Sequence, residues 1–163
     1  MEKKHINPDS KSLRIVLICM CAILAVMMYI KNRHQNQYKE IAKLPFYNIS
    51  VSNVEDGTYH GKTYTSFQHI QLDVSVKDHK ITKIDIIENE GSYGQKVAPI
   101  IDEMILQNQS VVTAIKGDEI ASILFIICVD DALKNGDPTF VAPVTNDSSN
   151  IIDTKSGLMP KIN

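Results

Sequence analysis

The sequence of 163 residues contains no tryptophan, and aromatic residues make up only 6% of it. Proteins that bind single-stranded nucleic acids stack the bases on aromatic side chains, and this chain has few of them. Its formal net charge of −2 also lacks the excess of lysine and arginine that binding to phosphates needs. We therefore expect no nucleic-acid partner.

Cysteine is equally scarce. Cys19 and Cys21 lie in an apolar segment near the N-terminus, which leaves Cys128 alone in the rest of the chain and allows no disulfide there. Because Cys128 lies in an apolar run without a neighbouring histidine, we expect a buried structural thiol. The histidines do not have the spacing of zinc ligands, and no nucleophile–base pair stands out. We expect neither a metal site nor catalytic residues.

One long hydrophobic run is present. From Ile15 to Ile30 no side chain is polar, and basic residues flank the run. As a helix it spans about 24 Å, slightly less than the ~30 Å hydrocarbon core of a bilayer. Including Leu13, and letting the flanking basic side chains reach the interface, makes up the difference. We predict a transmembrane anchor over residues 13–30, preceded by a basic arm over residues 1–12.

A cleaved signal peptide is the competing interpretation of this segment. The small residues that mark a cleavage site are missing, because Ala22 and Ala25 lie inside the run and bulky side chains over residues 27–30 end it. We therefore expect an uncleaved, single-pass anchor in the cell membrane. Four lysine or arginine residues lie near each end, so the positive-inside rule does not choose an orientation.

The remaining chain divides into a linker, a folded domain and a tail. Residues 31–53 are polar and compatible with a helix as far as the break before Pro45, which predicts a helical linker. Turn residues open the domain, which we place at residues 54–136. Residues 137–163 lack hydrophobic periodicity and are expected to form a loosely attached tail.

Alternating hydrophobicity predicts a β-hairpin in the domain. Apolar and polar residues alternate from Ile70 to Val76, and a second strand is expected over residues 81–88 after the turn at Asp78-His79. The other expected elements are a strand over 62–67, a helix over 95–107, a short strand over 110–115 and a helix over 118–133. The predicted fold is α+β, a small antiparallel sheet with a hairpin packed against two helices, preceded by one transmembrane helix.

Several short motifs follow one another through the domain. They are D-G-T-Y-x-G at Asp56–Gly61, K-D-x-K-I-T-x-I at Lys77–Ile84, a glycine-containing loop before a helix, Gln109-Ser110, and a glycine-led helix that ends at Leu133. In this order they resemble the bacterial FMN-binding domain family, small flavin-carrying domains of membrane-linked electron-transfer proteins. The resemblance implies FMN as a cofactor and a domain on the extracytoplasmic side of the membrane.

The resemblance implies that FMN lies at the start of the last helix, where unpaired backbone N–H groups favour a phosphate. In the family this turn reads S-G-A-T, and in many members the threonine carries FMN covalently. Here it reads Lys116-Gly117-Asp118-Glu119, followed by Ser122, so only the glycine and the serine survive. A carboxylate has no hydroxyl to esterify, so covalent attachment is not expected. The two acidic residues are expected to cap the helix themselves.

Two functions remain open. The first is an extracytoplasmic domain, anchored in the membrane, that binds flavin non-covalently and transfers electrons; the second is a flavin-free interaction module on the same fold. Both describe an electron carrier or a binding module rather than a catalyst. The cofactor-binding residues that the resemblance implies are Asn89, Gly94, Lys116, Gly117, Glu119 and Ser122.

The last helix differs from its relatives on a second face. Ile123 and Ile127 stand where relatives have lysine, and together with Ile120 they form an apolar stripe. We expect either the tail or a partner protein to cover this stripe. The adjacent pair Asp130 and Asp131 is interpreted as part of a solvated helix face.

Overall fold

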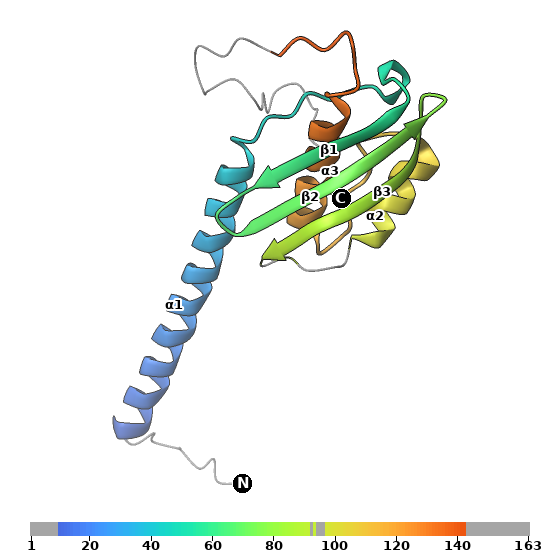
Figure 1. Ribbon diagram of the computed structural model, residues 1–163. Coiled ribbons are helices and arrows are strands. Elements are labelled where there is room, and N and C mark those ends of the chain that lie inside the picture. The colour runs from blue at the N-terminus through green and yellow to red at the C-terminus, as the bar shows by residue number, and fades with distance from the viewer. Residues whose placement is uncertain (1–9, 92, 94–96, 143–163) are drawn as a thin grey trace. The chain divides into compact units, whose positions relative to one another are not determined.

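The computed structural model describes residues 10–91, 93 and 97–142 (Figure 1). Within these ranges the chain forms three α-helices, one short 3-10 helix and three β-strands. It divides after Tyr38 into two compact units. The α+β class is confirmed, because helices accompany a three-stranded antiparallel sheet and the first helix is strongly apolar.

Helix α1 (Ser10–Ile41) contains the predicted anchor. Its large apolar side chains from Leu13 to Ile30 are 49–74% exposed. Leaving so much apolar surface in water is unfavourable, and a lipid environment removes that cost. In the described part of the chain, α1 is the one helix that is long and apolar enough to cross a membrane, which agrees with single-pass anchoring.

The first part of the predicted linker continues helix α1, which ends before Pro45 as expected. Helix α1 ends at Ile41, and an extended segment leads to the 3-10 helix η1 (Val51–Asn53). Pro45 favours this end, since a proline disfavours the helical conformation of the residue before it. The carboxylate of Glu40 accepts hydrogen bonds from the backbone N–H and the hydroxyl of Ser66, at 2.5 and 2.6 Å. These bonds join the end of α1 to the sheet.

The predicted hairpin is confirmed. Strands β1 (Gly57–Tyr64), β2 (Gln68–Lys77) and β3 (Lys80–Gly91) form an antiparallel sheet in the order β1-β2-β3. Asp78 and His79 connect β2 to β3, and both have positive φ angles, 52° and 56°. Two such residues give a turn whose twist matches that of the flanking strands. β1 begins five residues before the expected strand over 62–67.

Two helices cover the inner face of the sheet. Helix α3 (Glu119–Leu133) packs against β1 and β2, and helix α2 (Ala98–Gln107) packs against β3 (Figure 1). β1 approaches α3 closely at Gly61, where an added Cβ would lie 2.2 Å from the carbonyl oxygen of Cys128. The inner side chains of the central strand β2 are fully buried; they are Ile70, Leu72, Val74 and Val76.

The expected strand over residues 110–115 does not form, and this prediction is wrong. The backbone N–H of Ile115 donates to the hydroxyl of Ser122 at 3.0 Å, so it is used within the turn before α3 rather than in a sheet. A β-prone composition therefore did not suffice, because no strand of the described part of the chain pairs with this segment.

Asp130 is the residue whose surroundings differ most from expectation. The interpretation of a solvated face is wrong here, because Asp130 has no exposed surface. Its carboxylate accepts hydrogen bonds from the backbone N–H groups of Tyr47 at 2.6 Å and Ile49 at 2.7 Å. Burial raises the pKa of this carboxyl, while the backbone hydrogen bonds act in the opposite direction. The carboxylate fastens the extended segment after α1 onto α3.

We expect Asp130→Asn to destabilise the domain by about 2–3 kcal/mol, because the amide NH₂ would face a backbone N–H that needs an acceptor. Between the unfolded value of about pH 4 and the raised pKa of Asp130, the folded chain binds more protons than the unfolded chain, so its free energy of unfolding falls as the pH rises through this window. The variant cannot titrate there, so the stability difference between the two proteins should narrow with rising pH.

Urea unfolding of the full-length chain in detergent, followed by tyrosine fluorescence at several pH values, measures this difference. Asp102→Asn, at an exposed position on α2, is the matched control and should change little. A difference that stays constant or widens with rising pH would contradict the assignment.

Candidate functional site

The turn that leads into α3 brings four of the expected site residues together. Lys116 and Gly117 form the turn and are exposed, and Glu119 begins the helix. Gly117 has a φ angle of 89°, a backbone conformation that residues other than glycine rarely adopt. Ser122 follows one turn into the helix and is fully buried.

The side chain of Glu119 folds back onto the turn that precedes its helix. Its Oε1 accepts a hydrogen bond from the backbone N–H of Gly117 at 2.8 Å. This hydrogen bond holds the pKa of the Glu119 carboxyl below its usual range. Both acidic residues lie at the start of α3, as expected, but the side chain of Asp118 at the N-cap position makes no capping hydrogen bond, and Glu119 instead binds the N–H of Gly117, which precedes the helix.

The hydroxyl of Ser122 is used within the same turn. It donates to the backbone carbonyl of Asp118 at 2.9 Å and accepts from the backbone N–H of Ile115 at 3.0 Å. Both its donor and one acceptor position are therefore engaged, and the side chain has no exposed surface. The hydroxyl stabilises the turn and is not presented to a ligand.

These residues fit the phosphate of FMN poorly. A phosphate seated on the Gly117 N–H would have to displace the Glu119 carboxylate and would meet its negative charge at close range. Lys116 is the one basic residue in the turn, and its side chain is exposed. The turn is thus closed by its own side chains.

Asn89 belongs to a different network at the end of the hairpin. Its Oδ1 accepts from Nε2 of Gln68 at 2.6 Å, and Oε1 of Gln68 accepts the backbone N–H of Tyr93 at 2.9 Å. Gln68 is 2% exposed. The sequence did not predict that its side chain would join these segments, and its position at the start of a strand with a buried face was the only indication. Gly91 lies against it, since an added Cβ would meet Gln68 Oε1 at 2.5 Å. Gly94 lies outside the described residues.

The apolar stripe of α3 is buried. Ile120, Ile123 and Ile127 are 4–5% exposed. The sheet packs on one side of the helix, and the segment held by Asp130 lies on another. From the predicted tail over residues 137–163, Phe140 packs against the same core and contacts the ring of Tyr47.

Cys128 has the expected structural role. It is fully buried, and its Sγ donates to the carbonyl oxygen of Ile70 at 3.6 Å. Burial raises the pKa of the thiol to about 12, so the thiolate is not formed near neutral pH.

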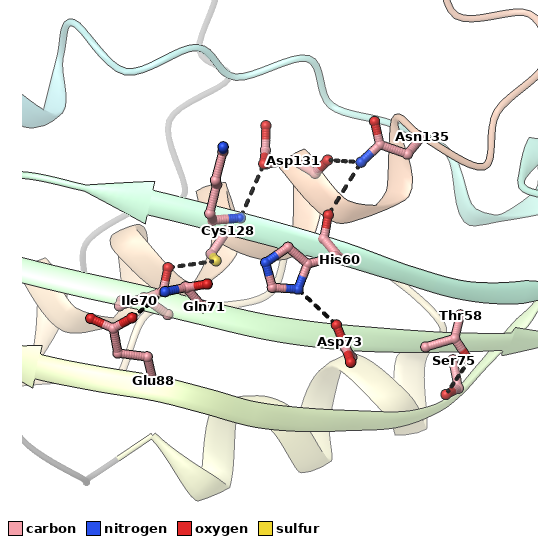
Figure 2. Close-up of polar contacts among 11 residues, drawn as sticks. Thr58, His60, Ile70, Gln71, Asp73, Ser75, Glu88, Cys128, Asp131 and Asn135 are labelled. Atoms are coloured by element: carbon pink, nitrogen blue, oxygen red, sulfur yellow. Dashed lines mark hydrogen bonds and ion pairs between the residues drawn. The ribbon is translucent and has the colours of Figure 1, made fainter.

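The solvent-facing side of the sheet carries a ladder of polar pairs (Figure 2). His60 Nδ1 lies 2.9 Å from Asp73 Oδ1, Thr58 contacts Ser75, and Gln71 donates to Glu88. Such cross-strand pairs stabilise an antiparallel sheet. In the described ranges no group of histidine, cysteine and acidic side chains could hold a metal ion.

A polar groove of about 400 Å³ lies between residues 48–52 and 108–111. Its walls carry no ionisable side chain, and Ser110 in it donates to the carbonyl of Ile49 at 3.3 Å. The groove marks where the two segments meet.

Comparison with known proteins adds no relative. No family model matches the chain. No curated protein and no solved structure matches it either.

We expect Ser122→Ala to lower the free energy of unfolding by about 1–3 kcal/mol, because the partly buried N–H of Ile115 would lose its acceptor. Urea unfolding of the full-length chain in detergent measures the loss. Ser50→Ala, at an exposed serine, is the control. Equal stability of Ser122→Ala and the wild type would show that the hydroxyl does not hold the turn.

Proposed function

We propose that this chain is a membrane-anchored, flavin-free binding module on the fold of the FMN-binding domain family. The observation that carries the proposal is the 2.8 Å hydrogen bond from the Gly117 N–H to the Glu119 carboxylate. In the family that the sequence resembles, this turn seats the phosphate of the cofactor. Here a side chain of the chain itself occupies the seat and brings a negative charge to it.

The proposal places the domain on the extracytoplasmic side of the cell membrane, anchored by residues 13–30. An apolar helix of sufficient length supports the anchor. The side of the membrane rests on the resemblance alone, because many members of that family carry their domain outside the cytoplasm.

Non-covalent FMN binding with electron transfer is the second candidate. Lys116 supports it, because its exposed side chain lies in the turn and its charge would offset part of the repulsion between Glu119 and a phosphate. Covalent attachment has no support, since the position of the esterified threonine is Glu119.

An FMN titration separates the two candidates. We expect the full-length chain, purified in detergent, to carry no flavin absorbance and to leave FMN fluorescence unquenched at high micromolar protein. The double variant Asp118→Ala/Glu119→Thr, which removes both charges and supplies a hydroxyl, should quench FMN more than the wild type does.

The matched control is Asp102→Ala/Glu103→Thr, which makes the same change in charge on α2 and should behave as the wild type. Saturable quenching by the wild type would contradict the flavin-free proposal and favour the second candidate.

A further inference from the structure

The two edges of the sheet are unlike. The outer edge of β1 is closed by the end of α3, because Asp131 accepts the backbone N–H of Lys62 at 3.1 Å and Asn135 donates to the carbonyl of His60 at 3.2 Å (Figure 2). Side chains thus occupy the backbone groups that another strand would use, which is one way in which proteins protect a sheet edge.

Among the described residues, a side chain caps the outer edge of β3 only where the strand begins, and the register of β3 with β2 shifts at two places further along. Asn108, at the end of α2, accepts the backbone N–H of Ile81 at 2.9 Å and donates to the carbonyl of His79 at 3.1 Å. Beyond this point, no strand in the described part of the chain pairs with the outer edge of β3. Ile86 and Ile87, in the second half of the strand, are 41% and 57% exposed.

The charges of β3 are divided between its two halves. The first half carries Lys80 and Lys83, and the second half carries Asp85, Glu88 and Glu90. Lys83, Asp85 and Glu88 lie on the solvent-facing side of the sheet. Lys83 forms an ion pair with Asp85 at 2.8 Å, and Glu88 accepts a hydrogen bond from Gln71, whose side chain is also on that side. A strand with this order of charges is complementary to itself when it is reversed.

We propose that β3 pairs antiparallel with β3 of a second copy of this chain, which makes one continuous six-stranded sheet. With the two-fold axis at Ile84, Lys80 lies opposite Glu88 of the second copy, and Lys83 lies opposite Asp85. Symmetry repeats each pair, so four pairs of opposite charge form across the junction. Because Asn108 already binds the backbone of His79 and Ile81, the backbone groups of residues 82–86 supply the hydrogen bonds between the two copies.

Charge on an edge strand is also a means of preventing association. Charges of one sign would repel a second copy wherever it pairs. On β3 the signs are separated, so reversed pairing of two copies about Ile84 is attractive from Lys80 to Glu88. The same separation favours a second copy over an unrelated strand.

This inference deepens the proposed function, on which it rests, by naming the partner of the module. It is tested with the full-length chain in detergent. We expect sedimentation to give a dimer for the wild type. The variants Lys80→Glu/Lys83→Glu and Asp85→Lys/Glu88→Lys should each dissociate at least about tenfold more readily, because like charges then meet across the junction.

Mixing the two variants is the decisive measurement. Opposite charges meet again in the mixed pair, so copies carrying two different tags should co-purify at the level of the wild type. Lys62→Glu/Lys77→Glu places the same charge change on exposed positions outside β3 and should leave the dimer intact. Circular dichroism checks that every variant is folded.

A monomeric wild type would overturn the inference, as would a dimer that neither variant weakens, since α1 or another surface would then hold it. Failure to regain the pair on mixing would also overturn it. These outcomes are distinct from failure of the proposed function, which appears as flavin binding in the FMN titration whatever the oligomeric state.

Discussion

The buried carboxylate of Asp130 is the interaction on which the rest of the domain depends. Helix α3 is apolar on nearly every side, so it needs a cover on the side away from the sheet. The extended segment after α1 provides that cover, but its backbone N–H groups require acceptors once they are buried. Asp130 supplies two of them, at Tyr47 and Ile49. The Asp130 side chain thus allows the backbone N–H groups of the extended segment to be buried against α3 without losing their hydrogen bonds.

The sequence predicted those elements whose hydrophobic pattern repeats regularly. The alternation from Ile70 to Val76 and the run from Ile15 to Ile30 correctly indicated a strand and an exposed apolar helix. Residues 110–115 have β-prone side chains, yet a strand also needs a neighbour, which composition does not reveal. Asp130 was misjudged for a similar reason, since the segment that buries it lies about eighty residues away in the chain.

The candidate site was predictable in composition and not in geometry. The sequence indicated that acidic residues stand where the family that it resembles seats a phosphate. It did not reveal that Glu119 bonds the N–H of Gly117, or that both sides of the Ser122 hydroxyl are engaged. Asn89, which the resemblance placed near a cofactor, instead bonds Gln68 at the end of the hairpin. Such assignments depend on side-chain directions that motif spacing does not contain.

The closure of β1 by Asp131 and Asn135 limits how far an assembly can grow. A sheet with two free edges can add copies without end and form a filament. A sheet with one free edge can pair with only one other copy. In that dimer the two β1 strands, whose outer edges are capped by side chains, lie at the two ends of the joint sheet. The end of α3 therefore makes any assembly through this sheet finite.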